Sequence, residues 1–215
     1  MSPRVAILGA GGHAKVVADI LLCMRRADTA ELEIAGFIAP GEQGWLDLPC
    51  LGDDNALPDL VRNGIVTHFL VGIGAVKGGK GLRQKVVESA EAAGAKPFTA
   101  IHPSATIGHD VDIRHGATIM ARTAINPGCH IGEHAVVNTG ATIDHDCRVG
   151  AFAHIAPGVT LSGGVAIGVN TLIGVGSTIR QGAVVGANTT VGAGAVVVSD
   201  LAAEVIAVGC PAKPL

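Results

Sequence analysis

Residues 107–155 read IGHDVDIRHGATIMARTAINPGCHIGEHAVVNTGATIDHDCRVGAFAHI, and an aliphatic side chain returns at every sixth position. The step of six extends beyond this stretch without a change of register, through seventeen positions that are all Ile, Val or Leu: Ile101, Ile107, Ile113, Ile119, Ile125, Ile131, Val137, Ile143, Val149, Ile155, Leu161, Ile167, Ile173, Ile179, Val185, Val191 and Val197. An α-helix has about 3.6 residues per turn, so a period of six would spread these side chains around its whole surface. A coiled β-solenoid accommodates the period, because each short strand sends one aliphatic side chain inward before the chain turns a corner.

A second register accompanies this aliphatic ladder. Four residues after each ladder position stands a small or slim residue, from Ala105 to Ala195, and only the last position, Leu201, departs from the rule. Cys129 and Cys147 fall in this register, which predicts that both thiols fill the core. A glycine often follows the ladder residue directly, where we expect a corner with unusual backbone angles: Gly108, Gly132, Gly150, Gly168, Gly174, Gly186 and Gly192.

Composition narrows the class of protein. The 215 residues are enough for two small domains, and aromatic residues make up only 2%, which suits the narrow interior of a β-helix. The net charge of −3 argues against a protein that binds nucleic acid through phosphate contacts. The five cysteines show neither a CxxC motif nor zinc-ligand spacing, so we expect no metal. No signal peptide precedes Val5, and no apolar run approaches the roughly 20 residues of a membrane span, so we expect a soluble, cytoplasmic protein without membrane insertion.

The N-terminal part has the pattern of a nucleotide-binding α/β domain. An apolar run at residues 4–8 predicts a buried parallel strand, the turn Gly9-Ala-Gly-Gly-His-Ala14 follows, and residues 15–24 have helical spacing. Further strands are expected at 34–38 and 67–72 and a further helix at 82–93. Glycines between a strand and a helix let a phosphate approach bare backbone, and the helix N-terminus favours an anion. We therefore expect a Rossmann-like βαβ domain over residues 1–100, followed by the solenoid and a short tail over 101–215.

Alternatives to nucleotide binding remain open from the residues alone. A dinucleotide fits poorly, because the second strand ends in Phe37-Ile-Ala-Pro40 without the acid that would hold a ribose, and because only about three strands are expected. A mononucleotide moiety fits better than NAD. The glycines could instead pack the helix on the strand. Lys77, Lys80 and Arg83, in the loop after the third strand, could steady a pyrophosphate or form a solvated basic loop.

The strongest catalytic candidate in the solenoid is His145. It lies in a polar cluster, Asn138-Thr-Gly-Ala-Thr-Ile-Asp-His-Asp146, and histidine is the side chain best suited to accept a proton near neutral pH. The flanking carboxylates of Asp144 and Asp146 favour the imidazolium and so raise the basicity of His145. A solvated surface histidine is the alternative. His154 is close enough in sequence to share the same groove.

These stretches together resemble the NeuD/PglD-type sugar acyltransferases over nearly the whole chain. The resemblance is carried by the hexads and by five short stretches: Gly9-Ala-Gly-Gly-His-Ala-Lys-Val-Val-Ala-Asp19, Asn138-Thr-Gly140, His145-Asp-Cys147, Phe152-Ala-His-Ile-Ala-Pro-Gly158 and Gly209-Cys-Pro-Ala-Lys213. It implies a βαβ domain followed by a left-handed parallel β-helix, a homotrimer with active sites between subunits, and transfer of an acetyl group from acetyl-CoA to the 4-amino group of a UDP- or GDP-linked amino-dideoxy sugar, for surface polysaccharide or glycan synthesis.

The resemblance also implies roles for individual residues. His145 matches the general base and Asp146 its acidic partner, which makes a covalent intermediate on Cys147 unnecessary. Residues that match contacts to acetyl-CoA are His154, Gly163, Val175 and Ala193. Residues that match the loop and strand end receiving the nucleotide sugar are Gly11, Gly12, His13 and Gly74.

Two departures from the family pattern bear on the substrate. Ala39-Pro40 replaces the acid expected after the second strand, and the loop from Lys77 to Arg83 is longer than usual. Either departure could mean GDP in place of UDP, or a substrate without a nucleotide. O-acetylation of sialic-acid-like sugars is the alternative reaction within the family. A non-catalytic scaffold or nucleotide sensor is the alternative of another class.

Overall fold

A computed structural model describes residues 2–41, 47–74 and 81–215, so Lys77 and Lys80 lie outside the described residues. The chain divides into two compact units, residues 1–103 and 104–215. The first is a parallel α/β unit and the second a left-handed parallel β-solenoid, which confirms the predicted fold class. Among the described residues, the structure contains no helix with the length and apolar character of a membrane span.

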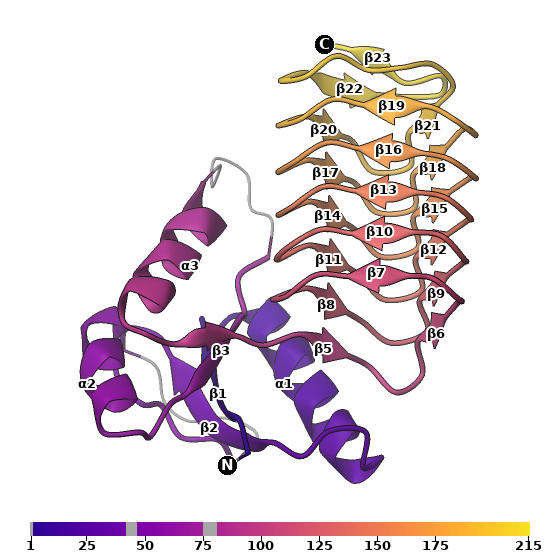
Figure 1. The fold of residues 1–215 in the computed structure, drawn as a ribbon. Coiled ribbons are helices and arrows are strands. Elements are labelled where there is room, and N and C mark those ends of the chain that lie inside the picture. The colour runs from indigo at the N-terminus through magenta and orange to yellow at the C-terminus, as the bar shows by residue number, and fades with distance from the viewer. Residues whose placement is uncertain (1, 42–46, 75–80) are drawn as a thin grey trace. The chain divides into compact units, whose positions relative to one another are not determined.

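The first unit is built on a parallel sheet with the strand order β2-β1-β3-β4 (Figure 1). The strands are β1 (Arg4–Leu8), β2 (Glu33–Ile38), β3 (His68–Val71) and β4 (Lys96–Pro97), and the short β5 (Ala100–Ile101) comes last in this unit. All residues of β1 after Arg4 are buried, as expected for a central strand covered on both faces. The three longer strands lie where the sequence predicts them, and β4 extends the sheet by one strand.

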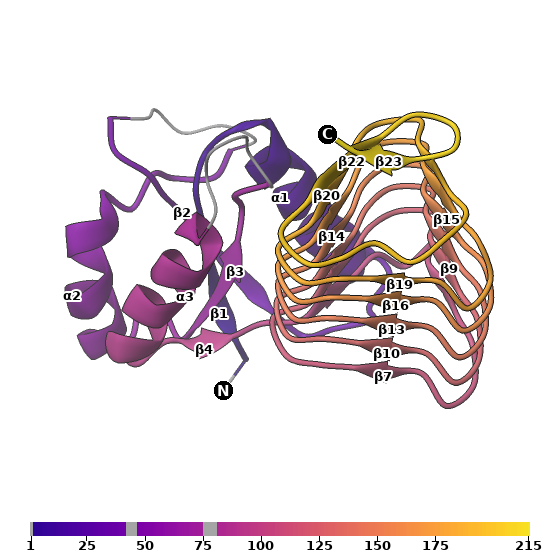
Figure 2. The ribbon, with the colours of Figure 1, turned by 90° about the horizontal axis from the view of Figure 1, so that it is seen from above.

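Helices cover both faces of this sheet. Helix α1 (Gly12–Arg26) lies on one face, and α2 (Leu57–Arg62) and α3 (Leu82–Ala92) lie on the other (Figures 1 and 2). The buried stripe of α1 has the spacing of an amphipathic helix: Ala14, Val17, Ala18, Ile20, Leu21 and Met24. Helix α2 was not predicted, because its six residues are too few to establish a helical period. A 3₁₀ turn, η1 (Asp54–Ala56), precedes it.

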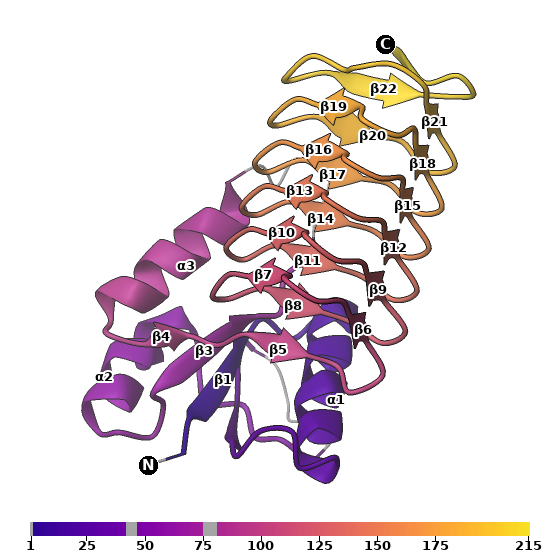
Figure 3. The same cartoon turned by 45° about the vertical axis from the view of Figure 1, so that its right-hand side comes forward.

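The second unit coils around three sheets, which form the sides of a three-sided prism (Figures 2 and 3) and are parallel except where β23 pairs antiparallel with β22. The β6 sheet contains β6 (Thr106–Ile107), β9 (Ala124–Ile125), β12 (Thr142–Ile143), β15 (Thr160–Leu161), β18 (Thr178–Ile179) and β21 (Val196–Val197). The β7 sheet contains β7 (Asp112–Ile113), β10 (His130–Ile131), β13 (Arg148–Val149), β16 (Ala166–Ile167) and β19 (Val184–Val185). The β8 sheet contains β8 (Thr118–Ile119), β11 (Val136–Val137), β14 (His154–Ile155), β17 (Leu172–Ile173), β20 (Thr190–Val191), β22 (Ile206–Val208) and β23 (Lys213–Pro214).

Each coil takes eighteen residues, or three hexads. His130 pairs with Arg148 and Thr142 pairs with Thr160, so residues eighteen apart lie one above the other in adjacent coils. All fourteen ladder side chains from Ile119 to Val197 are at most 4% exposed. The ladder therefore points inward, as predicted, and forms the core of the prism.

The small-residue register also points inward. Cys129 and Cys147 are buried, and each thiol donates to a main-chain carbonyl of the next coil, that of Asp144 at 3.0 Å and that of Ser162 at 3.2 Å. The Ser177 hydroxyl does the same, donating to the carbonyl of Gly192 at 2.9 Å. A thiol or a hydroxyl at equivalent positions of the coil thus donates to an equivalent carbonyl group. This supports the prediction that these cysteines are core residues.

The corners differ from the prediction. The glycines that directly follow the ladder have ordinary φ angles, and the next coil passes close to them: a Cβ on Gly132 would lie 2.6 Å from the backbone nitrogen of Ala151. The left-handed conformation falls two residues later, at the third position after the ladder residue. There, φ is between +54° and +75° at all fifteen corners from Asp110 to Gly194, including non-glycine residues such as Asp146.

Candidate active site

The two central residues of the candidate site occupy one corner of the prism. His145 is the second residue after the ladder residue Ile143, and Asp146 is the third, so Asp146 takes the left-handed conformation of every such corner, with φ +59°. The Nδ1 atom of His145 lies 2.9 Å from Oδ2 of Asp146, and the two side chains are 53% and 73% exposed. The repeating backbone therefore turns both side chains outward and toward each other.

This contact fixes the tautomer of the imidazole. An ionised carboxylate can only accept hydrogen bonds, so Nδ1 of His145 must carry the proton that is donated to Asp146. In the neutral imidazole, Nε2 then has a free lone pair. The hydrogen bond from His145 to Asp146 is the largest cause of a raised pKa for His145, and the charge of Asp144 is the next. The site thus presents a correctly oriented base of increased basicity.

Two glycines one coil away make room for this pair. A Cβ on Gly163 would lie 2.5 Å from Nε2 of His145, and a Cβ on Gly128 would lie 2.6 Å from Oδ1 of Asp146. Gly163 has an ordinary φ, and the equivalent corner position holds Ala151 elsewhere, so the coil itself does not require glycine there. Gly163 is therefore required by the imidazole that lies against it.

Asp144 stabilises the corner in a different way from Asp146. Its Oδ1 accepts hydrogen bonds from Nδ2 of Asn126 at 2.8 Å and from the backbone N–H of His145 at 2.9 Å. These two bonds, the one from Asn126 first, lower the pKa of Asp144. Asn126 was not predicted as part of the site. It precedes Asp144 by eighteen residues, which is one full coil, and this spacing in the sequence could have identified it.

Cys147 follows this pair in sequence but lies inside the prism. Burial raises the pKa of its thiol to about 11, and its Sγ donates to the carbonyl of Ser162. A thiol that remains protonated at neutral pH is a poor nucleophile. The geometry therefore supports the prediction that Cys147 takes no part in a covalent intermediate.

His154 lies on strand β14 and contacts a different set of residues. Nδ2 of Asn138 lies 3.2 Å from Nε2 of His154, while Oδ1 of Asn138 accepts from the backbone N–H of Thr139 at 2.8 Å. The second bond fixes the amide orientation, so Asn138 donates to Nε2, and the neutral His154 ring carries its proton on Nδ1. Its Nε2 is already occupied as an acceptor, which distinguishes His154 from His145.

The residues expected to contact acetyl-CoA lie along two edges of the prism. Gly163 is at the corner that follows the β6 sheet, beside His145, whereas Val175 and Ala193 are at the corner that follows the β8 sheet, one coil apart. All three are the second residue after a ladder residue. Their backbone N–H groups form no hydrogen bond with any other residue that the structure describes. The structure therefore brings Gly163 to His145 but does not bring Val175 and Ala193 to it within one solenoid.

In the first unit, the glycines of the turn after β1 have different roles. Gly9 has φ +112°, and a Cβ there would lie 3.1 Å from Cγ1 of Ile73, so this glycine is required by the turn and by packing. Gly11 and Gly12 are exposed, and a Cβ on either would meet nothing within 4 Å. Packing thus explains Gly9 but not Gly11 or Gly12, which present open backbone at the N-terminus of α1.

His13 and Gly74 lie together at this edge of the sheet. A Cβ on Gly74 would lie 3.5 Å from the His13 ring, so the ring rests against that strand end. Burial, followed by the positive charge of Arg83, lowers the pKa of His13 to about 4. His13 is therefore neutral at physiological pH. Arg83 is 8% exposed, and its pKa is lowered by burial to about 10, so it stays charged.

The end of β2 contains no acid. Ala39 is 7% exposed, and its N–H donates to the carbonyl of Gly52 at 3.0 Å. The segment around Gly52 thus covers the position where the family pattern has a carboxylate. An acid for this edge would have to come from another segment.

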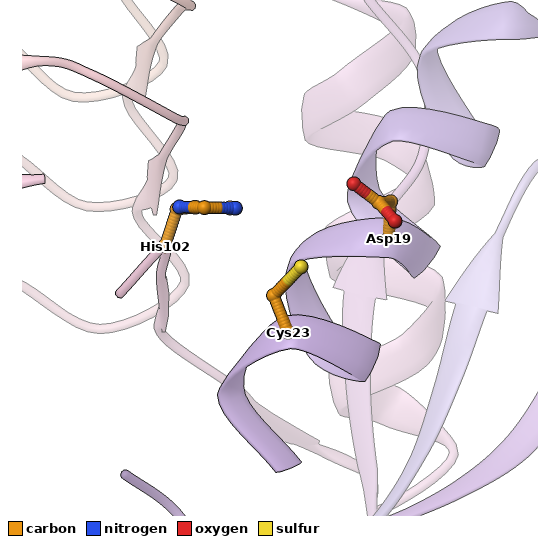
Figure 4. A group of neighbouring side chains, drawn as sticks. All are labelled: Asp19, Cys23 and His102. Carbon is orange, nitrogen blue, oxygen red and sulfur yellow. The ribbon is translucent and has the colours of Figure 1, made fainter. Parts of the chain in front are cut away.

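A group in the first unit, away from these residues, could hold a metal ion. Asp19 and Cys23 lie one turn apart on α1, and the ring of His102 points toward them (Figure 4). One ligand atom from each lies within 4.8 Å of the others. The group offers three ligands, one fewer than a closed structural zinc site, and lies outside the candidate active site.

Comparisons with known proteins agree with this fold. A family model for the PglD N-terminal domain matches residues 4–90. PerB of Caulobacter crescentus, solved with CoA and GDP-perosamine, is 42% identical with a TM-score of 0.88, and the match covers 99% of this chain and 97% of that chain. The acetyltransferase domain of PglB from Neisseria gonorrhoeae, solved with acetyl coenzyme A, is 35% identical with a TM-score of 0.89 and full coverage of both chains. A search of curated protein sequences gave no match.

An α/β unit followed by a hexapeptide-repeat prism, with a histidine–aspartate pair on one corner, defines a sugar acyltransferase of the solenoid class. The chain belongs to the NeuD/PglD-type sugar acetyltransferase family.

Proposed function

We propose that this protein transfers the acetyl group of acetyl-CoA to the 4-amino group of a nucleotide-linked amino-dideoxy sugar. The observation that carries the proposal is the His145–Asp146 pair, whose imidazole is oriented by a 2.9 Å hydrogen bond and rests against Gly163. Family membership supports the reaction, because the similar Caulobacter protein is a perosamine N-acetyltransferase that was crystallised with CoA and GDP-perosamine.

His145 acts as the general base in this proposal. Acetyl-CoA supplies the acetyl group as an activated thioester. The nitrogen of the amine forms a bond to the carbonyl carbon, and the C–S bond breaks. The amine must lose a proton during this step, and the free lone pair on Nε2 of His145 accepts it. The proton then passes to the departing thiolate. Asp146 keeps Nδ1 protonated and stabilises the imidazolium, as the acid of a catalytic triad does.

The backbone at the corners offers donors for the co-substrate. The N–H of Gly163 lies beside His145 and is not used in coil-to-coil hydrogen bonding, so it can stabilise the negative charge that develops on the thioester oxygen. We assign further contacts with acetyl-CoA to His154, Val175 and Ala193. The free N–H groups of Val175 and Ala193 suit the carbonyl groups of an extended, amide-containing chain.

A homotrimer would complete this site. His145 and Gly163 lie on one edge of the prism and Val175 and Ala193 on another, so two copies must meet for these edges to face a single ligand. Exposed apolar side chains on the prism also favour association: Val169 is 48% exposed, Val175 54% and Val184 47%. Light scattering at micromolar concentration should give three times the mass of the chain, and a monomer would contradict the arrangement.

We assign nucleotide-sugar binding to residues 1–100 and acetyl transfer to residues 101–215. The open backbone at Gly11 and Gly12, next to the helix N-terminus, suits the diphosphate. His13, neutral and resting on Gly74, can donate or accept a hydrogen bond without adding charge. Because acetyl-CoA and nucleotide sugars are cytoplasmic metabolites, the proposed reaction places the protein in the cytoplasm.

The direct test is the release of free thiol from acetyl-CoA in the presence of UDP- and GDP-linked 4-amino sugars. We expect turnover with at least one of them and none with the corresponding 4-hydroxy sugars. Turnover only with a free nonulosonic acid would instead identify an O-acetyltransferase. Full activity of a His145→Ala variant would remove His145 from the chemistry.

A further inference from the structure

We propose that a cavity in the first unit binds the base of the nucleotide and that Asp54 and Lys85 select guanine. The inference rests on the proposed function only in taking a nucleoside diphosphate as the carrier of the sugar. The cavity measures about 210 Å³, and Leu8, Leu57 and Leu82 contribute to its apolar lining.

The position of the cavity suits a nucleotide. Leu8 is the last residue of β1, and the exposed glycines Gly11 and Gly12 follow it directly in the chain. Ligands of open α/β sheets bind at the carboxyl ends of the strands. A base in this cavity would therefore be one short turn of chain from the backbone to which we assign the diphosphate.

The apolar walls suit a flat ring. Leu57 is buried, whereas Leu82, the first residue of α3, is 41% exposed although it lines the cavity. A base that stacks between apolar side chains removes such surface from water. The partial exposure of Leu82 is what a wall of an open base-binding cavity would show.

The polar groups determine which base fits. Asp54 and Lys85 line the cavity, and neither forms an ion pair or a side-chain hydrogen bond with another described residue. A carboxylate only accepts hydrogen bonds, and an ammonium only donates them. The Watson–Crick edge of guanine carries two adjacent donors, N1–H and the 2-amino group, followed by the acceptor O6. Asp54 as acceptor and Lys85 as donor are the two kinds of group that this edge requires.

Uracil, the base of the other expected carrier, fits less well. Uracil carries one donor between two carbonyl oxygens, so a carboxylate that accepts from N3–H also meets an acceptor of like polarity. Rejection of a base that leaves a polar group unpaired is the usual source of such selectivity. Asp54 therefore favours guanine over uracil.

Asp54 supplies the carboxylate that lines this cavity. The adjacent Asp53 cannot do so, because its Oδ1 already accepts the backbone N–H of Asn55 at 3.0 Å as the cap of η1. Asp54 has the same charge and lies one residue further along, but it faces the cavity. These neighbours form a matched pair: Asp54→Asn removes the charge from the cavity, and Asp53→Asn removes the same charge outside it while keeping a capping side chain.

The test is titration calorimetry of the full chain with GDP, UDP and inosine diphosphate, which lacks the 2-amino group. We expect the wild-type protein to bind GDP at least about tenfold more tightly than UDP, and roughly fivefold more tightly than inosine diphosphate. Asp54→Asn should weaken GDP about tenfold, leave UDP nearly unchanged, and reduce the difference between GDP and inosine diphosphate. Asp53→Asn should behave as the wild type. Lys85→Met should weaken GDP and inosine diphosphate equally, because both carry O6.

Equal affinities of the wild-type protein for GDP and UDP would overturn the inference. Equal weakening of both nucleotides by Asp54→Asn would also overturn it, because the carboxylate would then act on the shared ribose or diphosphate. Thiol release with GDP- and UDP-linked amino sugars separates the two proposals. Equal turnover of GDP- and UDP-linked amino sugars would contradict only the assignment of guanine. Selective binding of GDP without turnover would contradict only the proposed acetyl transfer.

Discussion

The two units hold their functional groups in different ways. In the prism, His145 and Asp146 occupy a corner whose backbone is repeated at fifteen positions, so their orientation follows from a geometry that the whole solenoid enforces. In the first unit, Gly11 is the N-cap of α1 and Gly12 and His13 are its first two residues, at a strand-to-helix junction that is not part of a repeat and depends on local packing. The difference suggests a division of labour, in which the chemistry sits on a rigid repeat and the recognition of the substrate on a turn that can vary.

The largest expected effect is on the rigid side of this comparison. His145→Asn removes the base but keeps a polar side chain of similar size, and we expect kcat to fall about a thousandfold. Affinity for both substrates should be almost unchanged. Calorimetry and thiol release on the same preparation would separate binding from chemistry, and a comparable loss of affinity would contradict the assignment.

Gly163→Ala should have the next largest effect. The added methyl group would lie 2.5 Å from Nε2 of His145, so the imidazole must move, and we expect kcat to fall about a hundredfold. Because the φ of Gly163 is ordinary, the coil itself should tolerate alanine. The control is the same substitution in a His145→Ala background, where the thermal midpoint should not change further. A large loss of stability in that background would show that the backbone, not the imidazole, requires glycine.

Asp146→Asn should have a smaller effect on rate and a characteristic effect on pH dependence. Asparagine is well tolerated in the left-handed conformation, so the corner should keep its shape. The carboxylate is the main cause of the raised pKa of His145, so its loss should move the acid limb of kcat/KM to lower pH while reducing kcat about tenfold. Asp144→Asn, the control, should move the limb less. A limb that stays in place in Asp146→Asn would mean that His145 is not the group that titrates.

The smallest effects are expected in the first unit, where substitution of one glycine should affect affinity and substitution of another should affect stability. Gly12→Ala meets open space, so the fold should be unaffected and nucleotide-sugar affinity should fall roughly fivefold as bare backbone is covered. Gly72→Ala would bring a Cβ within 2.8 Å of both Ala14 and Ile7, and should reduce the free energy of unfolding by about 1–3 kcal/mol. Chemical denaturation and calorimetry on both variants would test this contrast. A loss of stability in Gly12→Ala would show that Gly12 is required for packing and not for binding.

The same contrast explains which features the sequence could predict. A six-residue period is a local pattern, so the ladder and its inward direction could be read directly. The partners of the site are one coil away, and the eighteen-residue spacing becomes visible only once three hexads are known to close a coil. With that spacing, Asn126 pairs with Asp144, and Gly163 pairs with His145. Their contribution therefore could not be predicted from the hexads alone.

In the first unit, prediction from the sequence is limited by short elements and by local packing. Its longer strands and helices have clear periods, but α2 and β4 are too short to show one. The loss of an acid at Ala39 was visible, whereas the presence of Asp54 in a cavity depends on how η1 packs, which no local pattern encodes. The glycines after the ladder were correctly noticed and wrongly explained, because a close approach of the next coil leaves no mark on the sequence that distinguishes it from a positive φ.

The most direct test of His145 as the base is to compare two titrations of the same protein. The pKa of the His145 imidazole in the free enzyme can be followed by NMR, and the acid limb of kcat/KM for acetyl transfer reports the base in the free enzyme. We predict that the two values coincide above the ordinary histidine value of 6.5, and that both move down together in Asp146→Asn. An acid limb that does not follow the titration of His145 would contradict the account.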